Sequence, residues 1–287
     1  MKNLLNTMKI DDHAKASLDA PSRDKRGIRS QVPPLIAVVL VLVLWEIIYL
    51  SGWRPHYVLP SPLQVLERLM SLLGDAKFWL GVSTTMTRAG VGFGISVLIG
   101  TVVGLLVSQS RILREALGSL ITGMQTMPSI AWFPFAILIF GLTENAILFV
   151  VLLGAAPSIA NGLISGVDEI PRPLLRNAQS MGATGLRLYR YVVMPAALPA
   201  YVSGLKQGWA FAWRSLMAGE LLVIIASRPS LGASLQFFRE FSDTTGLMAI
   251  MMVILLVGMG VDQIFTALSK QLQLRRGLGG GLQARKA

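Results

Sequence analysis

The chain alternates between long apolar runs and shorter polar segments. Six of these apolar runs hold about twenty residues each, the length needed for a helix that spans a bilayer. These runs cover residues 33–50, 89–107, 120–140, 146–164, 200–225 and 247–268. The pattern therefore predicts an all-α membrane protein with six transmembrane helices.

Prolines and glycines indicate irregular places within these runs. Pro128 and Pro134 both fall inside the third run, so we expect that helix to be kinked. Arg111 and Arg114 lie just before it, in what we expect to be a short loop. The second run carries two pairs of glycines at four-residue intervals, which let another helix backbone approach closely. They are Gly90, Gly94, Gly100 and Gly104.

A charged segment, 168–195, separates the fourth run from the fifth. Charges at the centre of a bilayer cost several kcal/mol each, so this segment is expected to lie in water. Pro171 suits the start of a short helix, and Gly182 suits its end. Thr184 is placed to cap a second short helix, which we expect to end at Pro195.

This segment resembles a known signature. Gly182 is followed after nine residues by Val192, and after one more by Met194 and Pro195. The spacing is similar to that of the cytoplasmic loop of permease subunits in binding-protein-dependent ABC importers. In that family the loop docks on the ATPase subunit and couples hydrolysis to transport. The resemblance assigns this coupling to Arg176, Asn177, Ala178, Gly182, Ala183, Tyr189, Val192 and Pro195.

The start of the signature departs from the family. The family usually opens it with Glu-Ala-Ala, whereas this chain has Arg176, Asn177 and Ala178. A basic contact therefore replaces the acidic one that the family shows at this place.

A second motif resembles one branch of the same family. Leu59-Pro60-Ser61-Pro62 precedes an amphipathic helix, as in the sulfonate, taurine and nitrate importers. The resemblance implies a type I ABC importer permease fold and a small solute, a sulfonate or related oxyanion. It also implies a homodimer, two ATP-binding subunits that hold ATP and Mg²⁺, and an extracytoplasmic solute-binding protein. No cofactor is expected on this chain.

The basic residues predict the orientation in the membrane. With the N-terminus inside, the inner segments hold 18 Lys and Arg and the outer segments hold 5. Because positive charge favours the cytoplasmic side, both termini and the 168–195 loop are predicted to be cytoplasmic. We divide the chain into a polar tail, 1–30, a permease domain in the cell membrane, 31–270, and a basic tail, 271–287.

Composition excludes several classes of function. The chain is 53% hydrophobic and 14% charged, with a mean hydropathy of +0.60, which is too apolar for an ordinary soluble domain. The excess of basic residues in the predicted inner segments accounts for the net charge of +11, so no nucleic-acid partner is required to explain it. It has no cysteine, two histidines and no Walker A, HExxH or GxSxG motif. We therefore expect neither a catalytic site nor a metal site.

Four polar residues inside the apolar runs are candidates for the translocation pathway. They are Gln125, Thr126, Arg214 and Glu220. Arg214 and Glu220 are six residues apart and cannot pair well within one helix. Either they line the pathway, or Arg214 pairs structurally with Glu220 of a second subunit. Lys206 and Asp262, near inner helix ends, are expected to make structural pairs.

Two alternatives from other classes remain open. A stand-alone secondary transporter or channel for small anions would need no ATPase, although such transporters often contain two repeated halves, which this sequence lacks. A membrane-embedded enzyme would need clustered acidic or histidine residues at the membrane surface, which the sequence also lacks.

Overall fold

The computed structural model describes residues 32–275, and every regular element within that range is helical. The prediction of an all-α protein is confirmed there, while the tail 1–30 and most of 271–287 lie outside the described residues. The chain divides into two compact units, Met1–Pro62 and Leu63–Ala287. In the first unit the apolar helix α3 (Val32–Leu50) is followed by a turn, and the Trp45 indole N–H donates to the Pro60 carbonyl at 3.1 Å.

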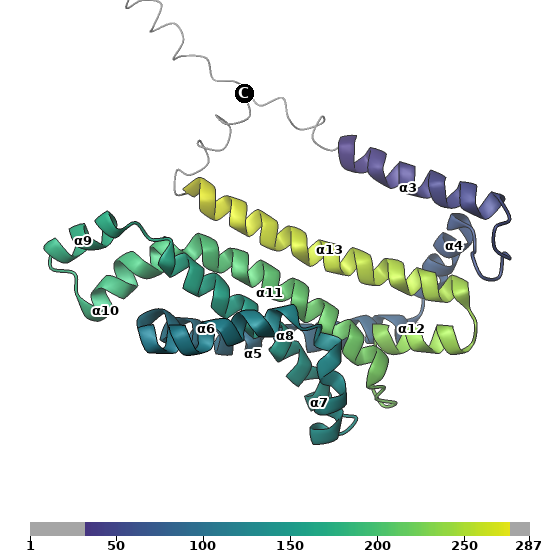
Figure 1. The fold of residues 1–287 in the computed structure, drawn as a ribbon. Coiled ribbons are helices and arrows are strands. Elements are labelled where there is room, and N and C mark those ends of the chain that lie inside the picture. The colour runs from purple at the N-terminus through teal and green to yellow at the C-terminus, as the bar shows by residue number, and fades with distance from the viewer. Residues whose placement is uncertain (1–31, 276–287) are drawn as a thin grey trace, which may run out of the picture. The chain divides into compact units, whose positions relative to one another are not determined.

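The second unit contains the remaining helices (Figure 1). In chain order they are α4 (Pro62–Leu73), α5 (Ala76–Gln109), α6 (Arg111–Thr126), the 3₁₀ helix η1 (Ser129–Trp132), α7 (Phe133–Phe140), α8 (Glu144–Asp168), α9 (Arg172–Ser180), α10 (Gly185–Leu188), the π-helical turn η2 (Tyr189–Val193), α11 (Met194–Leu222), α12 (Leu231–Glu240) and α13 (Thr244–Arg275). Among the described residues, α5, α8 and α13 are each long and apolar enough to cross a membrane.

Helix α5 is longer than the predicted second span. It starts at Ala76, where the Asp75 carboxylate caps it by accepting from the Lys77 backbone N–H at 2.9 Å. Arg88, which directly precedes the predicted span, therefore lies within this helix. In the polar stretch before residue 89, the Thr84 and Thr87 hydroxyls donate to carbonyls of their own helix, four residues earlier in the chain.

The predicted third span is broken rather than kinked. Helix α6 and the η1–α7 segment meet at an angle of 102°, and together they can form a broken span or a re-entrant loop. The break follows Met127 because Pro128 has no N–H with which to continue the helix. The short loop expected around Arg111 is also absent, since Ser110 alone separates α5 from α6 and accepts from the Leu113 N–H.

Helix α8 packs closely against both α5 and α11. A Cβ atom on Gly100 would lie 2.6 Å from the Ala156 carbonyl oxygen, and one on Gly162 would lie 2.5 Å from the Gly204 Cα. The backbones therefore touch where only glycine fits. Of the predicted glycine pairs on α5, the pair that contains Gly100 makes such contacts, whereas a Cβ at Gly90 would meet nothing within 4 Å.

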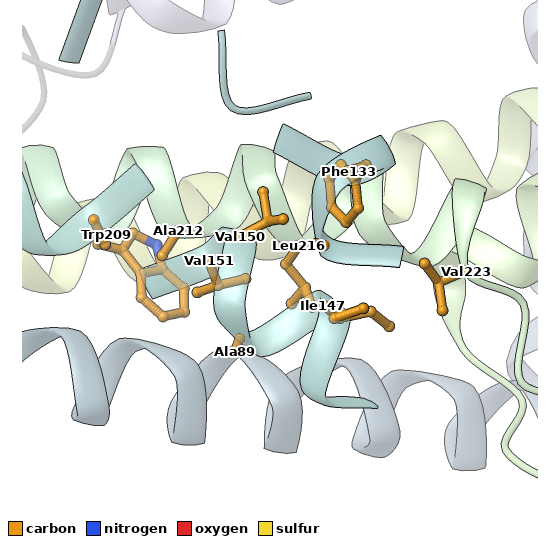
Figure 2. Close-up of a cluster of buried hydrophobic side chains, with 12 residues drawn as sticks. Ala89, Phe133, Ile147, Val150, Val151, Trp209, Ala212, Leu216 and Val223 are labelled. Carbon is orange, nitrogen blue, oxygen red and sulfur yellow. The ribbon is translucent and has the colours of Figure 1, made fainter. Parts of the chain in front are cut away.

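A buried apolar cluster fills the space between these helices and the broken span (Figure 2). Phe133 from the start of α7 is fully buried and lies near Ile147 and Val150 of α8 and Leu216 of α11. This cluster ties the short α7 helix to the α8–α11 pair.

Candidate functional site

The segment between α8 and α11 is a pair of short helices joined by a glycine turn. Helix α9 begins after Pro171, and the backbone of Gly182 has φ +85°, in the left-handed region that favours glycine. The Gly182 N–H donates to the Gln179 carbonyl and the Ala183 N–H to the Ala178 carbonyl, both at 3.0 Å. The predicted start and stop of the first short helix are thus confirmed.

The second short helix differs from the prediction. Thr184 occupies the N-cap position of α10, but its side chain makes no capping hydrogen bond. The backbone stays helical through η2, and Pro195 lies in the first turn of α11 instead of ending a helix. A proline is tolerated there because the first turn of a helix needs no N–H from it. Helix α10, the η2 turn and α11 therefore follow one another without a loop between them.

The residues assigned to ATPase coupling divide by exposure. Arg176, Asn177, Gly182 and Pro195 are exposed. Ala178, Ala183, Tyr189 and Val192 are half-buried. Figure 1 shows α9 and α10 at one end of the α8–α11 pair. Residues 172–193 therefore form a protrusion, here called the knob, in which the small side chains of Ala178 and Ala183 are partly buried.

The base of this knob is fixed by an ion pair and by close helix packing. Arg114 of α6 pairs with Asp168 at the end of α8, and it also donates to the Ser108 carbonyl at 3.1 Å. A Cβ on Gly166 would lie 2.7 Å from the Ala197 carbonyl oxygen, so α8 and α11 touch where they enter and leave the knob.

A buried cluster of charges lies toward the opposite end of α11. The Arg88 guanidinium donates through Nε and Nη2 to both oxygens of Glu144 at 2.7 Å, and through Nη1 to Glu220 at 2.9 Å. The Arg88 side chain is 6% exposed and Glu220 is fully buried. Arg228 lies 3.6 Å from Glu144 at the solvent side. The cluster joins α5, the start of α8 and the end of α11.

Glu220 also holds the start of α12. Its carboxylate accepts from the Thr85 hydroxyl at 2.9 Å and from the Gly232 N–H at 3.0 Å, while Thr85 accepts from the Leu231 N–H at 3.0 Å. A Cβ on Gly232 would lie 2.4 Å from the Glu220 Cβ, so the approach requires glycine. A buried carboxylate at a helix N-terminus satisfies its donors and is stabilised by the helix dipole.

These contacts correct one interpretation of Glu220. A bond from Arg214 of a second subunit was considered as its structural role. Glu220 has no exposed surface, and its carboxylate already bonds with Arg88, Thr85 and Gly232 of its own chain. Sequence reasoning missed Arg88 and Glu144, although an isolated arginine beside an apolar run already implies an acidic partner.

Arg214 lies in a different environment. Its Nε donates to the Ala210 carbonyl at 3.2 Å, and its Cζ lies 5.2 Å from the Phe211 ring centre. Within residues 32–275, neither Nη group has a hydrogen-bond partner. Arg214 and Asp262 line a groove of about 700 Å³ between α11 and α13 whose other walls are largely apolar. The Arg214 side chain is therefore exposed beside this groove.

The remaining polar candidates are tied to the fold. Gln125 donates its side-chain amide to the Pro157 carbonyl of α8 at 3.2 Å, and Thr126 donates to Gly123 of its own helix at 2.8 Å. Lys206 pairs with Asp262 at 3.2 Å, which confirms the structural pair expected for both. Within the described residues no group of three His, Cys, Asp or Glu side chains could hold a metal ion.

The chain is similar to known transport proteins. Residues 96–273 match the family described as binding-protein-dependent transport system inner membrane component. The taurine transport system permease protein of Escherichia coli K12 is 30% identical, over 82% of this chain and 86% of that protein. The putative aliphatic sulfonates transport permease protein of the same organism is 29% identical, over 85% and 92%. The nitrate import permease protein of Synechocystis sp. is 27% identical, over 67% and 72%.

A solved structure has the same fold. One chain of the inward-facing MetNI methionine ABC transporter aligns with a TM-score of 0.58 and 22% identity, covering 68% of this chain and 96% of that chain. At this identity the likeness shows the fold alone.

Proposed function

Because the chain belongs to the family of binding-protein-dependent transport system inner membrane components, we propose that it forms the translocation pathway for a small oxyanion, a sulfonate or a related solute such as taurine or nitrate. As a member of this family it is a transport permease subunit of an ABC importer, a multi-pass protein of the inner membrane and not a catalytic enzyme. The solute is inferred from relatives that transport taurine, aliphatic sulfonates and nitrate.

Separate ATPase subunits supply the energy for transport, since the permease relatives are components of ABC transporters. Two such subunits bind ATP and Mg²⁺, one against each permease of a homodimer, and this chain carries no ATPase site of its own. The observation that supports the coupling role is the exposed knob of α9 and α10, which continues without interruption into α11. An extracytoplasmic binding protein delivers the solute.

Six spans complete the permease domain, 31–270. α5, α8 and α13 are three of them, the α6–α7 pair is a fourth, and α3 and α11 supply the others. At 1.5 Å per residue, the 29 residues of α11 reach about 43 Å, enough to cross a hydrocarbon core of about 30 Å. The cytoplasmic termini and the cytoplasmic knob follow from the bias of basic residues.

Arg214 is our candidate for a contact with the anion on its way through. Its side chain points back along α11 toward Ala210, near the middle of the helix, and it has the groove beside it. Translocon scales put an arginine at mid-span at about 2.5–3.5 kcal/mol unfavourable, so a wet or anion-binding site accounts for its presence. A planar guanidinium is weakly hydrated and suits a sulfonate or similar oxyanion.

Purification from native membranes tests the assignment to an importer. We expect a tagged chain in mild detergent to bring down an ATPase subunit in equal amounts, and to lose it when Leu186, 84% exposed on the knob, becomes Asp. A matched change at an exposed apolar side chain on the same side of the membrane but outside the knob, Ile112→Asp, tests whether any new charge has this effect, since Ile112 is 79% exposed. If the pure chain carries no ATPase and exchanges small anions alone in liposomes, it is a stand-alone transporter or channel.

A further inference from the structure

The knob is basic on its exposed face, and its charges are unpaired. Arg172, Arg176, Arg187 and Arg190 are all exposed. Within the described part of the chain none of these four side chains forms a hydrogen bond or an ion pair, and the Arg190 Cζ lies 6.0 Å from the centre of the Tyr191 ring. The sequence contains no acidic residue between Glu169 and Glu220.

Arginines at the base of the same knob behave differently. Arg114 is paired with Asp168, and Arg111 is paired with Glu115 at 2.8 Å. The chain therefore supplies acidic partners around the knob but none on it. Four like charges within twenty residues repel one another and favour a partner of opposite charge.

Large apolar side chains are exposed between these arginines. Met181, Leu186 and Tyr191 are 87%, 84% and 71% exposed, and Leu174 is 45% exposed. Apolar side chains in a polar surround mark a site that another protein covers. The arrangement fits a shallow apolar groove with charges at its edge.

We propose that the surface which receives the knob is an apolar groove on the ATPase subunit with an acidic rim, whose carboxylates face Arg172, Arg176, Arg187 and Arg190. This inference rests on the proposed function, which makes the ATPase the occupant. Arginine suits such contacts because its planar fork binds a carboxylate through two parallel hydrogen bonds. The apolar side chains form the buried centre of the contact. The arginines make it specific for an acidic partner and raise the association rate.

The charge pattern has a consequence for partner choice. If the rim of an ATPase groove were basic, its charges would face the four unpaired arginines of the knob. Like charges brought together in an interface cost several kcal/mol. The permease therefore discriminates against ATPase subunits built for the acidic form of the signature.

Binding of the full chain to its ATPase subunit tests the inference. The chain is placed in nanodiscs of zwitterionic lipid, and the affinity of the co-purified ATPase subunit is measured at about 50 mM and 500 mM salt. The variant with all four arginines changed to Gln is compared with Arg111→Gln, which removes a paired arginine whose side chain is 92% exposed. A four-Lys variant keeps the charge but removes the fork.

We expect the four-Gln variant to bind roughly tenfold more weakly at low salt and to lose most of its salt dependence, because four rim pairs are removed. Arg111→Gln is expected to change the affinity less than twofold, and the four-Lys variant is expected to recover part of the loss. The inference is overturned if the four-Gln variant binds with wild-type affinity while Leu186→Asp loses binding. The knob would then be the docking site, but it would not need an acidic rim on the ATPase.

Two further outcomes decide against the inference. If Leu186→Asp also binds normally, the knob is not the docking site and the proposed coupling fails with it. If the four-Gln change weakens binding only when the nanodiscs contain anionic phospholipid, the arginines serve the membrane surface and not the ATPase.

Discussion

Replacing Arg88 by Gln is expected to destabilise the permease more than any other single change of an ion pair in the described chain. The substitution removes three charge-assisted hydrogen bonds of 2.7 to 2.9 Å and leaves Glu220 fully buried without its cation. Breaking a buried pair by removing one partner costs about 3–5 kcal/mol, since the remaining charge stays desolvated.

The expected loss of about 3–5 kcal/mol in the free energy of unfolding can be measured as a fall in melting temperature. For a domain of this size about 2–4 °C corresponds to 1 kcal/mol, so the loss should be roughly 10 °C. Arg228→Gln is the matched control, because that side chain is 65% exposed and lies 3.6 Å from Glu144. An exposed pair contributes less than about 1 kcal/mol, so the control should melt within roughly 4 °C of the wild type.

The assay is thermal unfolding of the purified chain in one detergent, followed by size-exclusion fluorescence. A double variant, Arg88→Gln with Glu220→Gln, completes the cycle. We expect it to be no less stable than Arg88→Gln alone, since it removes the stranded charge and keeps an acceptor for the Gly232 N–H. A melting point for Arg88→Gln within about 4 °C of the wild type, or additive losses in the double variant, would refute the argument.

Three further predictions concern coupling, the pathway and topology. Gly182→Asp should abolish uptake while the protein still inserts, because φ +85° strains a side chain and a new charge enters the docking surface; normal ATPase stimulation in this variant would contradict it. Arg214→Gln should slow uptake without loss of the dimer or complex, whereas weakened assembly in native gels would indicate a structural role. Reporter fusions at residue 25, within 168–195 and after 275 should all report the cytoplasm, and an external signal from the second would overturn the topology.

The existence of the long helices could be predicted because a bilayer leaves an apolar run no other conformation. The extent of α5 could not. Its first turns are polar, and Arg88 is accommodated only by Glu144 and Glu220, which lie 56 and 132 residues further along the chain. Periodicity within one segment contains no information on such distant partners.

The knob could be predicted in part from its own residues. Pro171 and Gly182 act locally, through a fixed φ and a positive φ, so the sequence alone indicates the first short helix. Pro195 is ambiguous, because proline suits both the first turn of a helix and the residues after one. The structure resolves it as the first turn of α11.

Reconstituted uptake is the most direct measurement of the central claim, that this chain is a passage driven by a separate ATPase. The chain, its ATPase subunit and its binding protein are placed in liposomes with a labelled sulfonate, taurine or nitrate. The account predicts uptake of a solute that requires ATP, the ATPase and the binding protein together, and that stops in Gly182→Asp. Equal uptake by liposomes that contain this chain alone would contradict it.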